Sequence, residues 1–323
     1  MTMVTRRAAL TGLAVLAAPA VVAQPAWPNG PIRLVAPFPP GGSVDAISRL
    51  LQPHLSQALG VPVVVENTGG ASGSIGTREV ALSRPDGNSW VLVFDTHAVN
   101  PALIPNMGFD TLKDLAPVLM IGTSPMVVTA TRGRNWADMA ALLAAAKAAP
   151  ETISYGTIAN GSLAHLTMKL VERETGTRFI HVPYRGGGPL STAAASAEVD
   201  LPVATGTILA ALMQGGTLRA LASTGARRAV VAPAAPTLKE LGINVEADAF
   251  WGVLAPAATP APVRARMEAA LRGALEVPVV KERLTGALGV DVAPQGPEAF
   301  QAFLVRQVET WGRVVRENGI KAD

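Results

Sequence analysis

A short loop rich in proline and glycine stands where a strand meets a helix, and its residue types could bind an anion. The segment 37–43 reads Pro-Phe-Pro-Pro-Gly-Gly-Ser and follows the apolar run 32–36. Prolines stiffen the loop, while Gly41 and Gly42 let the backbone approach a ligand closely. Ser43 is placed to cap the following helix, whose first N–H groups lack partners within the helix and attract anions. The loop therefore predicts a site for a carboxylate or a phosphate.

One helix start is too weak to bind an anion alone, because the helix dipole contributes roughly 0.3 to 1 kcal/mol and micromolar affinity requires about 8 kcal/mol. Other loops must contribute. Any one polar loop could be an ordinary turn, but the carboxyl ends of parallel strands meet at one edge of a sheet. We therefore expect a shared cleft from four further loops that follow predicted strands, at 95–98, 156–162, 184–188 and 204–207.

These five loops supply the expected ligand-binding residues. Phe38 is expected to wall the site, and the stretch 40–42 to present backbone N–H groups to the anion. Hydroxyl and amide groups of the other loops are expected to donate hydrogen bonds. The complete expected set is Phe38, Pro40, Gly41, Gly42, Asp45, Thr96, His97, Thr157, Asn160, Gly161, Ser162, Tyr184, Arg185 and Thr205.

Four charged or titratable residues near these loops have two readings each. Asp45 either stabilises the start of its helix or selects a ligand ammonium group. Arg185 either forms a bidentate pair with a carboxylate or lies in solvent at the rim. His97 and His165 either orient the ligand and its waters or fill structural positions.

The sequence offers no recognisable catalytic machinery. It contains no GxSxG, HExxH or SxxK motif, and it contains no cysteine. The glycine-rich segment 68–76 lacks both the GxGxxG spacing and the Lys-Ser/Thr pair of a phosphate-binding loop, which indicates a structural loop and leaves contact with the ligand open. We therefore expect no catalytic residue, no metal site and no cofactor.

Residues 1–23 have the pattern of a cleaved export signal. Arg6 and Arg7 precede an apolar stretch that ends in small residues at Ala23, and the paired arginines leave both the general secretory and the twin-arginine route open. The stretch is shorter than the ~20 residues that span a bilayer, and no later run is long and uncharged enough to do so. Without the two arginines, 25 basic residues face 24 acidic ones, so nucleic acid is not an expected partner.

The remaining 300 residues are long enough for two lobes that alternate strands and helices. Expected strands are 32–36, 61–65, 90–94, 118–121, 126–130, 153–155, 179–183, 199–203, 218–222 and 250–254. Expected helices follow Ser43 up to Leu59, with a kink or break at Pro53, and occupy 75–84, 136–148, 163–175, 189–197, a short segment that ends at Leu241, and 299–319. The alternation predicts parallel sheets. We expect lobe 1 to comprise 24–122 and 250–323, and lobe 2 to comprise 123–249.

An ordered set of short motifs resembles the Bug family, the periplasmic substrate-binding proteins of tripartite tricarboxylate transporters. The motifs are the loop at 37–42 with Asp45, Val64-Val65-Glu66-Asn67, Pro85-Asp86-Gly87, Asn160-Gly161-Ser162 with His165, His181-Val182-Pro183-Tyr184-Arg185-Gly186, Val199-Asp200-Leu201, and Trp251-Gly252 with Ala255-Pro256. The resemblance covers nearly all of the chain after residue 23. It implies a type II periplasmic-binding-protein architecture, with two doubly wound α/β lobes, crossing strands and a ligand cleft.

The resemblance also implies a function and partners. In that family the loops that match 38–42 and 95–97 hold a carboxylate, and loops of the second lobe set selectivity. The implied protein is a periplasmic monomer that closes on a small organic carboxylate and delivers it to transporter membrane subunits. A binding protein for a signalling receptor stays open as an alternative, as does an enzyme that uses Asp45, His97 or His165.

The chain departs from the family pattern after Val199-Asp200-Leu201. The family usually continues with Met-Phe and an aspartate, whereas this chain has Pro202-Val203-Ala204-Thr205, and Ala159 replaces a usual glycine. The missing acid at Ala204 favours a plain mono- or dicarboxylate over an amino acid.

Overall fold

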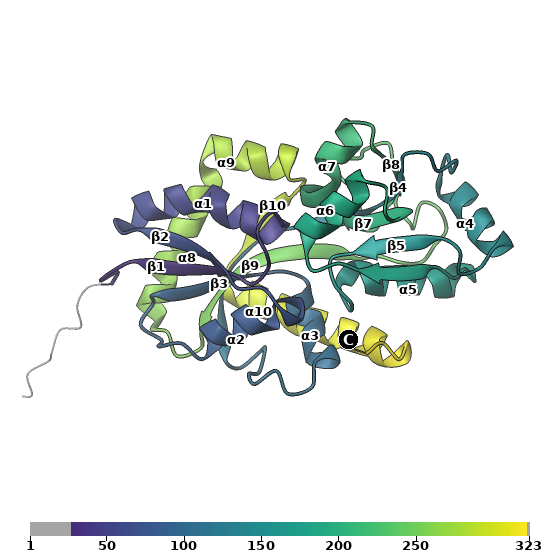
Figure 1. Cartoon of the computed structure of the whole chain (residues 1–323). Coiled ribbons are helices and arrows are strands. Elements are labelled where there is room, and N and C mark those ends of the chain that lie inside the picture. Colours follow the sequence, from purple (N-terminus) through teal and green to yellow (C-terminus); the bar gives the residue numbers. More distant parts are fainter. Residues whose placement is uncertain (1–26, 322–323) are drawn as a thin grey trace, which may run out of the picture.

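The computed structural model describes residues 27–321 and shows two α/β lobes side by side (Figure 1). The predicted export signal at 1–23 lies outside the described residues. The strands follow the order β2-β1-β3-β9-β4-β7-β5-β6, and β8 and β10 pair with β4 off this path. The strands are β1 (Ile32–Ala36), β2 (Val63–Asn67), β3 (Ser89–Val93), β4 (Leu115–Thr131), β5 (Ser154–Thr157), β6 (Ile180–Pro183), β7 (Leu201–Thr205), β8 (Leu218–Ser223), β9 (Asp248–Pro256) and β10 (Asp291–Gln295).

Helices join these strands and cover both faces of the sheet (Figure 1). They are α1 (Ser43–Leu59), α2 (Ser74–Ala81), α3 (Thr96–Leu103), α4 (Met139–Ala148), α5 (Leu163–Thr175), α6 (Gly187–Ala195), α7 (Gly206–Gln214), α8 (Ala261–Glu276), α9 (Pro278–Glu282) and α10 (Pro297–Glu317), with short helical turns at Ala71–Gly73 and Arg283–Ala287. No helix in the described part of the chain is long and apolar enough to cross a membrane.

Lobe 1 is organised around β1, which pairs in parallel with β2 on one side and β3 on the other. Ile32 and Trp90 are fully buried in its core, and α1 packs against α8. The three strands predicted here are confirmed, each within two residues of its expected bounds. Their carboxyl ends lie at one edge, where the loops to α1, α2 and α3 begin.

Lobe 2 repeats this arrangement with β5 at its centre, parallel to both β6 and β7. The predicted helix 163–175 is confirmed as α5 with the same bounds. Ser162 caps it by accepting a hydrogen bond from the His165 backbone N–H at 3.4 Å, and Gly176 ends it with a φ of 68°. A serine before the helix and a glycine after it are the signals that define helix ends.

Two antiparallel strands, β4 and β9, run from one lobe into the other. The sequence predicts two strands at 118–121 and 126–130, but the structure has one strand of 17 residues because the segment between them also pairs with β9. Beyond Pro125, β4 pairs with β7 and β8 of lobe 2. The predicted lobe bounds at 122 and 250 fall inside these crossing strands and stay a prediction.

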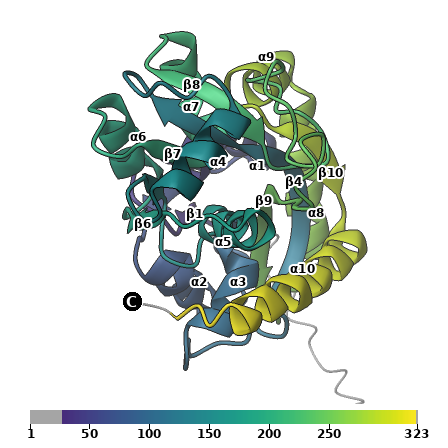
Figure 2. The same cartoon turned by 90° about the vertical axis from the view of Figure 1, so that its right-hand side faces the viewer.

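The C-terminal helices pack against lobe 1, since α8 contacts α1. Helix α10 lies along α3 and β4, and its C-terminal part reaches α5 of lobe 2 (Figure 2). Phe300 and Leu304 on its inner face are buried in the core. Near its end, Glu317 forms an ion pair with Arg173 at 3.6 Å, and the Lys321 carbonyl accepts from the Asn160 side chain at 2.9 Å. The helix therefore contacts both lobes.

Several local predictions are wrong. Gly42, not Ser43, is the N-cap of α1, and the Ser43 hydroxyl instead accepts from the Trp251 indole at 3.2 Å. Of the kink or break expected at Pro53, the break is absent from α1, where buried Leu51 and Leu55 anchor the helix on both sides of the proline; a kink stays a prediction. The short helix expected up to Leu241 is absent; that segment forms turns.

The packing of α10 yields a stability prediction. Phe300 is fully buried, and its ring lies 6.2 Å from that of Phe250. Phe300→Ala should lower the free energy of unfolding by about 3–5 kcal/mol, because it removes a packed ring and leaves a cavity. The matched control is Phe303→Ala, since Phe303 lies 5.0 Å from the same Phe250 ring but is only half-buried. Urea unfolding of both variants measures the difference, and equal losses would contradict the packing described here.

Candidate functional site

An open groove lies between the lobes, beyond the carboxyl ends of their strands. It has a free volume of about 670 Å³, within the range of small-molecule sites. Lobe 1 contributes the loops after β1 and β2 and the end of α3, and lobe 2 contributes the loops after β5 and β6. The lining residues are Phe38, Pro39, Gly69, Gly70, Ala71, Ser72, Gly73, Leu103, Ile104, Ile158, Ala159, Asn160, Pro183, Tyr184, Arg185 and Gly186.

Arg185 carries the only charge among these lining residues. It is exposed, and its side chain has no hydrogen bond or ion pair with any residue the structure describes. Its neighbour Tyr184 is already engaged, since its hydroxyl donates to Glu198 at 2.8 Å. Burial and the nearby Glu198 raise the pKa of Tyr184 to about 12, so the phenol keeps its proton. Arg185 is thus the group available to an anion here.

The glycine-rich segment after β2 forms one wall of the groove by packing against the first loop. A Cβ on Gly69 would lie 3.0 Å from Cδ of Pro39, and one on Gly73 would lie 3.1 Å from the ring of Phe38. Gly73 also has a φ of 87°. These glycines are therefore required for the close approach of two loops. The sequence predicts a structural loop here and leaves its contact with a ligand open.

The first loop has a different role from the one its sequence suggests. Pro40 has no N–H group, and the Gly41 N–H donates to the Asp45 carboxylate at 3.0 Å. Asp45 also accepts from the Arg49 and Asn67 side chains at 2.8 and 3.0 Å. The expectation that Gly41 offers a free N–H to an anion is therefore wrong, because Asp45 occupies that amide.

The same loop forms the contact between the lobes. A Cβ on Gly188 would lie 3.0 Å from the Pro40 carbonyl oxygen, and one on Gly187 would lie 3.1 Å from Cα of Gly42. Gly187 and Gly188 open α6 in lobe 2, so backbone meets backbone across the cleft. Gly41 and Gly42 thus let the main chain approach the other lobe.

Residues 96–98 of the predicted loop 95–98 form the first turn of helix α3, and side chains there face a tight space. Thr96 and His97 adjoin Phe38 and Ser72 in a pocket with no free volume for a ligand atom. Burial lowers the pKa of His97 to about 4, so its ring is neutral at pH 7. The ring stacks on Phe109 at 6.5 Å.

Below the loop after β5, three aromatic rings form a stack that supports it. The rings of His165 and His181 lie 3.8 Å apart, and that of Tyr155 lies 4.8 Å from His181. The Gly161 N–H donates to Nδ1 of His165 at 3.0 Å. Thr157 donates to the Ala159 carbonyl, so Nε2 of His181, 2.8 Å away, donates to the Thr157 hydroxyl. Thr157 and Gly161 are therefore engaged inside lobe 2.

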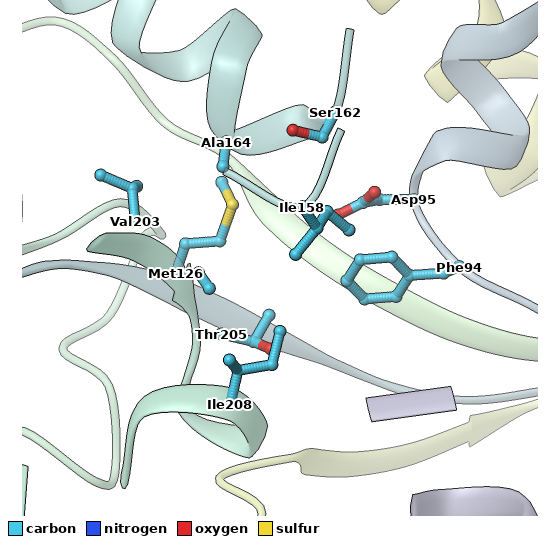
Figure 3. Close-up of a pocket in the computed structure, with 10 residues that line it drawn as sticks. Phe94, Asp95, Met126, Ile158, Ser162, Ala164, Val203, Thr205 and Ile208 are labelled. Atoms are coloured by element: carbon cyan, nitrogen blue, oxygen red, sulfur yellow. The ribbon is translucent and has the colours of Figure 1, made fainter. Parts of the chain in front are cut away.

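A second, smaller pocket lies deeper between the lobes, and Figure 3 shows side chains of both lobes around it. Its free volume is about 10 Å³. The expected residues Ser162 and Thr205 line it, although Ser162 also caps α5 and the Thr205 hydroxyl bonds to that of Thr207. The other lining residues are Phe94, Asp95, Met126, Ile158, Ala164, Val203, Ala204 and Ile208.

An aromatic series connects the groove with the base of the cleft. The ring of Phe38 lies 6.3 Å from that of Phe94, which lies 5.2 Å from the indole of Trp251 on the crossing strand β9. All three residues are buried. The groove wall is thus in contact with the strand that joins the two lobes.

The expected set is therefore only partly gathered in one place. Phe38, Asn160, Tyr184 and Arg185 line the groove, and Ser162 and Thr205 line the deeper pocket. The expected set does not include the groove walls at 69–73 and 103–104, nor Asp95 and Met126 in the deeper pocket. The sequence leaves ligand contact by the loop that contains 69–73 open, and Asp95 belongs to the expected cleft loop 95–98. The position of 69–73 at the carboxyl end of a predicted strand was the available signal; Met126 had none.

Comparison with known proteins shows the family. The family model described as "Tripartite tricarboxylate transporter family receptor" matches residues 47–320. The chain belongs to this receptor family. BugT of Bordetella pertussis (strain Tohama I) is 33% identical to this receptor over 322 residues, which cover 98% of each chain. The predicted membership of the Bug family is confirmed.

Solved structures confirm the predicted type II periplasmic-binding-protein fold of this receptor. The periplasmic binding protein BugD is 30% identical with a TM-score of 0.86, over 92% of this chain and 100% of BugD. Rpa4515 of R. palustris, solved with adipate, is 29% identical with a TM-score of 0.86, over 91% of this chain and 99% of Rpa4515. MatC (Rpa3494) of Rhodopseudomonas palustris, solved with bound malate, is 27% identical with a TM-score of 0.82, over 90% and 100%.

The histidine stack of this receptor makes stability depend on pH. Burial and the neighbouring His165 lower the pKa of His181 to about 3, below the ~6.5 of an unfolded histidine. As pH falls below about 6.5, the unfolded state binds a proton at His181 that the folded state does not bind. The free energy of unfolding therefore decreases. His181→Phe keeps a stacked ring but removes the group that takes up the proton. Between pH 7 and pH 5, the free energy of unfolding of this variant should therefore fall by about 1–2 kcal/mol less than that of the wild type. Urea unfolding at both pH values measures this, and an unchanged pH dependence would refute it.

Proposed function

We propose that this receptor binds a small organic carboxylate in the groove between its lobes, closes on it, and delivers it in the periplasm to transporter membrane subunits. Membership of the tripartite tricarboxylate transporter receptor family supports the delivery step. The adipate in Rpa4515 and the malate in MatC support a carboxylate ligand. The observation that carries the proposal is a groove of about 670 Å³ whose one charged side chain, Arg185, has no partner among the described residues.

The ligand is held by charge and by hydrogen bonds from both lobes. Arg185 pairs with a carboxylate, and the glycine-rich wall at 69–73 offers backbone groups to it. Phe38 and Ile104 cover the carbon chain. These contacts come from two lobes that β4 and β9 join, so a ligand that touches both stabilises the closed arrangement.

In this proposal the protein binds the carboxylate and catalyses no reaction on it. His165 and His181 are engaged within lobe 2, His97 stacks on Phe109, and none of the three lines the groove. Burial lowers the pKa of His97 and of His165 to about 4. The enzyme alternative required a placed base, and these rings serve the fold instead.

A thermal-shift screen tests the binding proposal directly. Purified protein is heated with mono- and dicarboxylates, amino acids and phosphorylated metabolites. A ligand at a hundredfold excess over its dissociation constant adds about 2.7 kcal/mol of stability. We expect carboxylates to raise the unfolding temperature; stabilisation by phosphorylated compounds alone would refute the choice of anion.

Arg185→Gln tests the role of the groove cation. Replacing the guanidinium by an uncharged amide should weaken carboxylate binding about tenfold, because a charge-assisted pair is lost. Arg313→Gln is the matched control: Arg313 is also exposed and unpaired among described residues, but it lies on α10 outside the groove. Isothermal titration calorimetry measures both. Equal affinities in the two variants would show that Arg185 is a solvated rim residue.

Gly188→Val tests closure. Its Cβ would lie 3.0 Å from the Pro40 carbonyl oxygen, so the side chain holds the lobes apart. Affinity should fall at least tenfold while the free energy of unfolding of the ligand-free protein stays near that of the control. That control is Gly273→Val, at a helical position of α8 with nothing within 4 Å of the added Cβ. If Gly188→Val binds like Gly273→Val, the glycine contact is not part of closure.

A further inference from the structure

Asp95 places a carboxyl group in the deeper pocket between the lobes. The residue is 3% exposed, and its Oδ1 has no hydrogen-bond partner among the described residues. Burial raises the pKa of Asp95, and it outweighs the opposite effect of the backbone N–H groups of Thr96 and of Leu163, the first residue of α5 in lobe 2. A buried oxygen without a partner is costly, so the ligand-free fold does not explain this acid.

The surroundings of Asp95 define what could bind to it. Most of the other lining side chains, such as Met126, Val203 and Ile208, are apolar, and none carries a positive charge. The free volume of about 10 Å³ is about that of one water-sized group. The pocket therefore suits a single small hydrogen-bond donor, and its free volume is too small for a carboxylate group.

The deeper pocket adjoins the groove. Ile158 lines both of them, and Phe94 of the deeper pocket packs on Phe38 of the groove wall. A ligand in the groove can thus direct one substituent past Ile158 toward Asp95. Ala204 also lines the deeper pocket, at the position where the family usually has an aspartate. In this chain Asp95 of lobe 1 places a carboxyl group in the same pocket.

We propose that Asp95 is the specificity-determining residue of this site and selects organic acids that carry an ammonium or hydroxyl group beside a carboxylate. The donor group enters the deeper pocket and hydrogen-bonds to Oδ1, while the carboxylate stays in the groove. This inference rests on the carboxylate-binding function proposed above. It reverses the preference for a plain acid that the alanine at 204 suggested.

Matched ligand sets test the selection. The sets are succinate, glutarate, adipate and propionate, each compared with its 2-hydroxy and 2-amino derivatives in both enantiomers. In the set that fits the groove, we expect at least one substituted acid to bind tenfold or more tightly than its plain parent, by isothermal titration calorimetry. Plain acids that bind as tightly as their derivatives overturn this inference and leave the carboxylate-binding function standing. If no acid binds, both fail.

Two substitutions separate the ammonium from the hydroxyl and show that Asp95 is responsible. Asp95→Ala should reduce the preference to less than threefold for either donor. Asp95→Asn removes the charge but keeps an acceptor oxygen, so the preference for a 2-amino acid should fall at least tenfold and that for a 2-hydroxy acid less than fivefold. A preference that survives Asp95→Ala overturns the proposal.

A control acid and a stability measurement distinguish selection from a structural role. Asp200 is also buried, but it bonds to Ser154 and Arg134 away from the cleft, so Asp200→Asn should keep the wild-type preference. The unfolding temperature of ligand-free Asp95→Asn should equal or exceed that of the wild type, since an unsatisfied buried acid is removed. A marked drop in that temperature, with the ligand preference kept, would assign Asp95 to the fold.

Discussion

The contact between the two lobes of this receptor depends on four glycines, which let the main chain of one lobe approach the main chain of the other. Gly41 and Gly42 end the first loop of lobe 1, and Gly187 and Gly188 open a helix of lobe 2. The N-terminal ends of α1 and α6 therefore face each other, and two positive helix ends repel. Asp45 in the first turn of α1 offsets this charge, since its carboxylate lies against the Gly41 N–H. The loop that resembles an anion site in the sequence is therefore already paired with an anion, the Asp45 carboxylate.

This constraint separates contact between the lobes from recognition of the ligand. The glycine contact closes one side of the cleft, and the groove with Arg185 lies on the other side of Pro39. The deeper pocket with Asp95 lies between the glycine contact and the groove, since its lining residue Ile208 adjoins Gly187 and its lining residue Ile158 also lines the groove. One exposed positive side chain and one buried acid are complementary to a ligand that carries both a carboxylate and a donor. Arg185 belongs to lobe 2 and Asp95 to lobe 1, so recognition of both ligand groups requires both lobes.

Local patterns predicted most of the fold, because strand alternation and helix caps are local signals. Helix α5 has its serine cap and terminal glycine in the sequence, and its bounds were predicted correctly. Helices α3 and α7 were missed because they begin directly after strands, at Thr96 and Gly206, in segments that read as polar loops. The long β4 was read as two strands, since Gly122 and Pro125 are turn residues elsewhere and only pairing with β9 makes them extended.

The site is harder to predict than the fold, because the role of a site residue depends on which residues of the other lobe lie next to it. Nothing near Asp95 in the sequence shows that Leu163 and Ala204 lie beside it. The two readings of Asp45, helix start or ligand ammonium, do not include the hydrogen bond that the Gly41 N–H donates to its carboxylate. Arg185 was the exception: a cation in a glycine-rich loop after a strand is a local signal, and it lies in the groove.

The aromatic series from Phe38 through Phe94 to Trp251 couples the ligand cavity to a natural fluorophore. The indole of Trp251 donates to Ser43 at the start of α1 and lies on a strand shared by both lobes. Any rearrangement that shifts the Phe38 ring alters the environment of a shielded indole, and indole emission follows such changes. Trp251 emission is therefore the natural signal with which to follow changes at the groove wall.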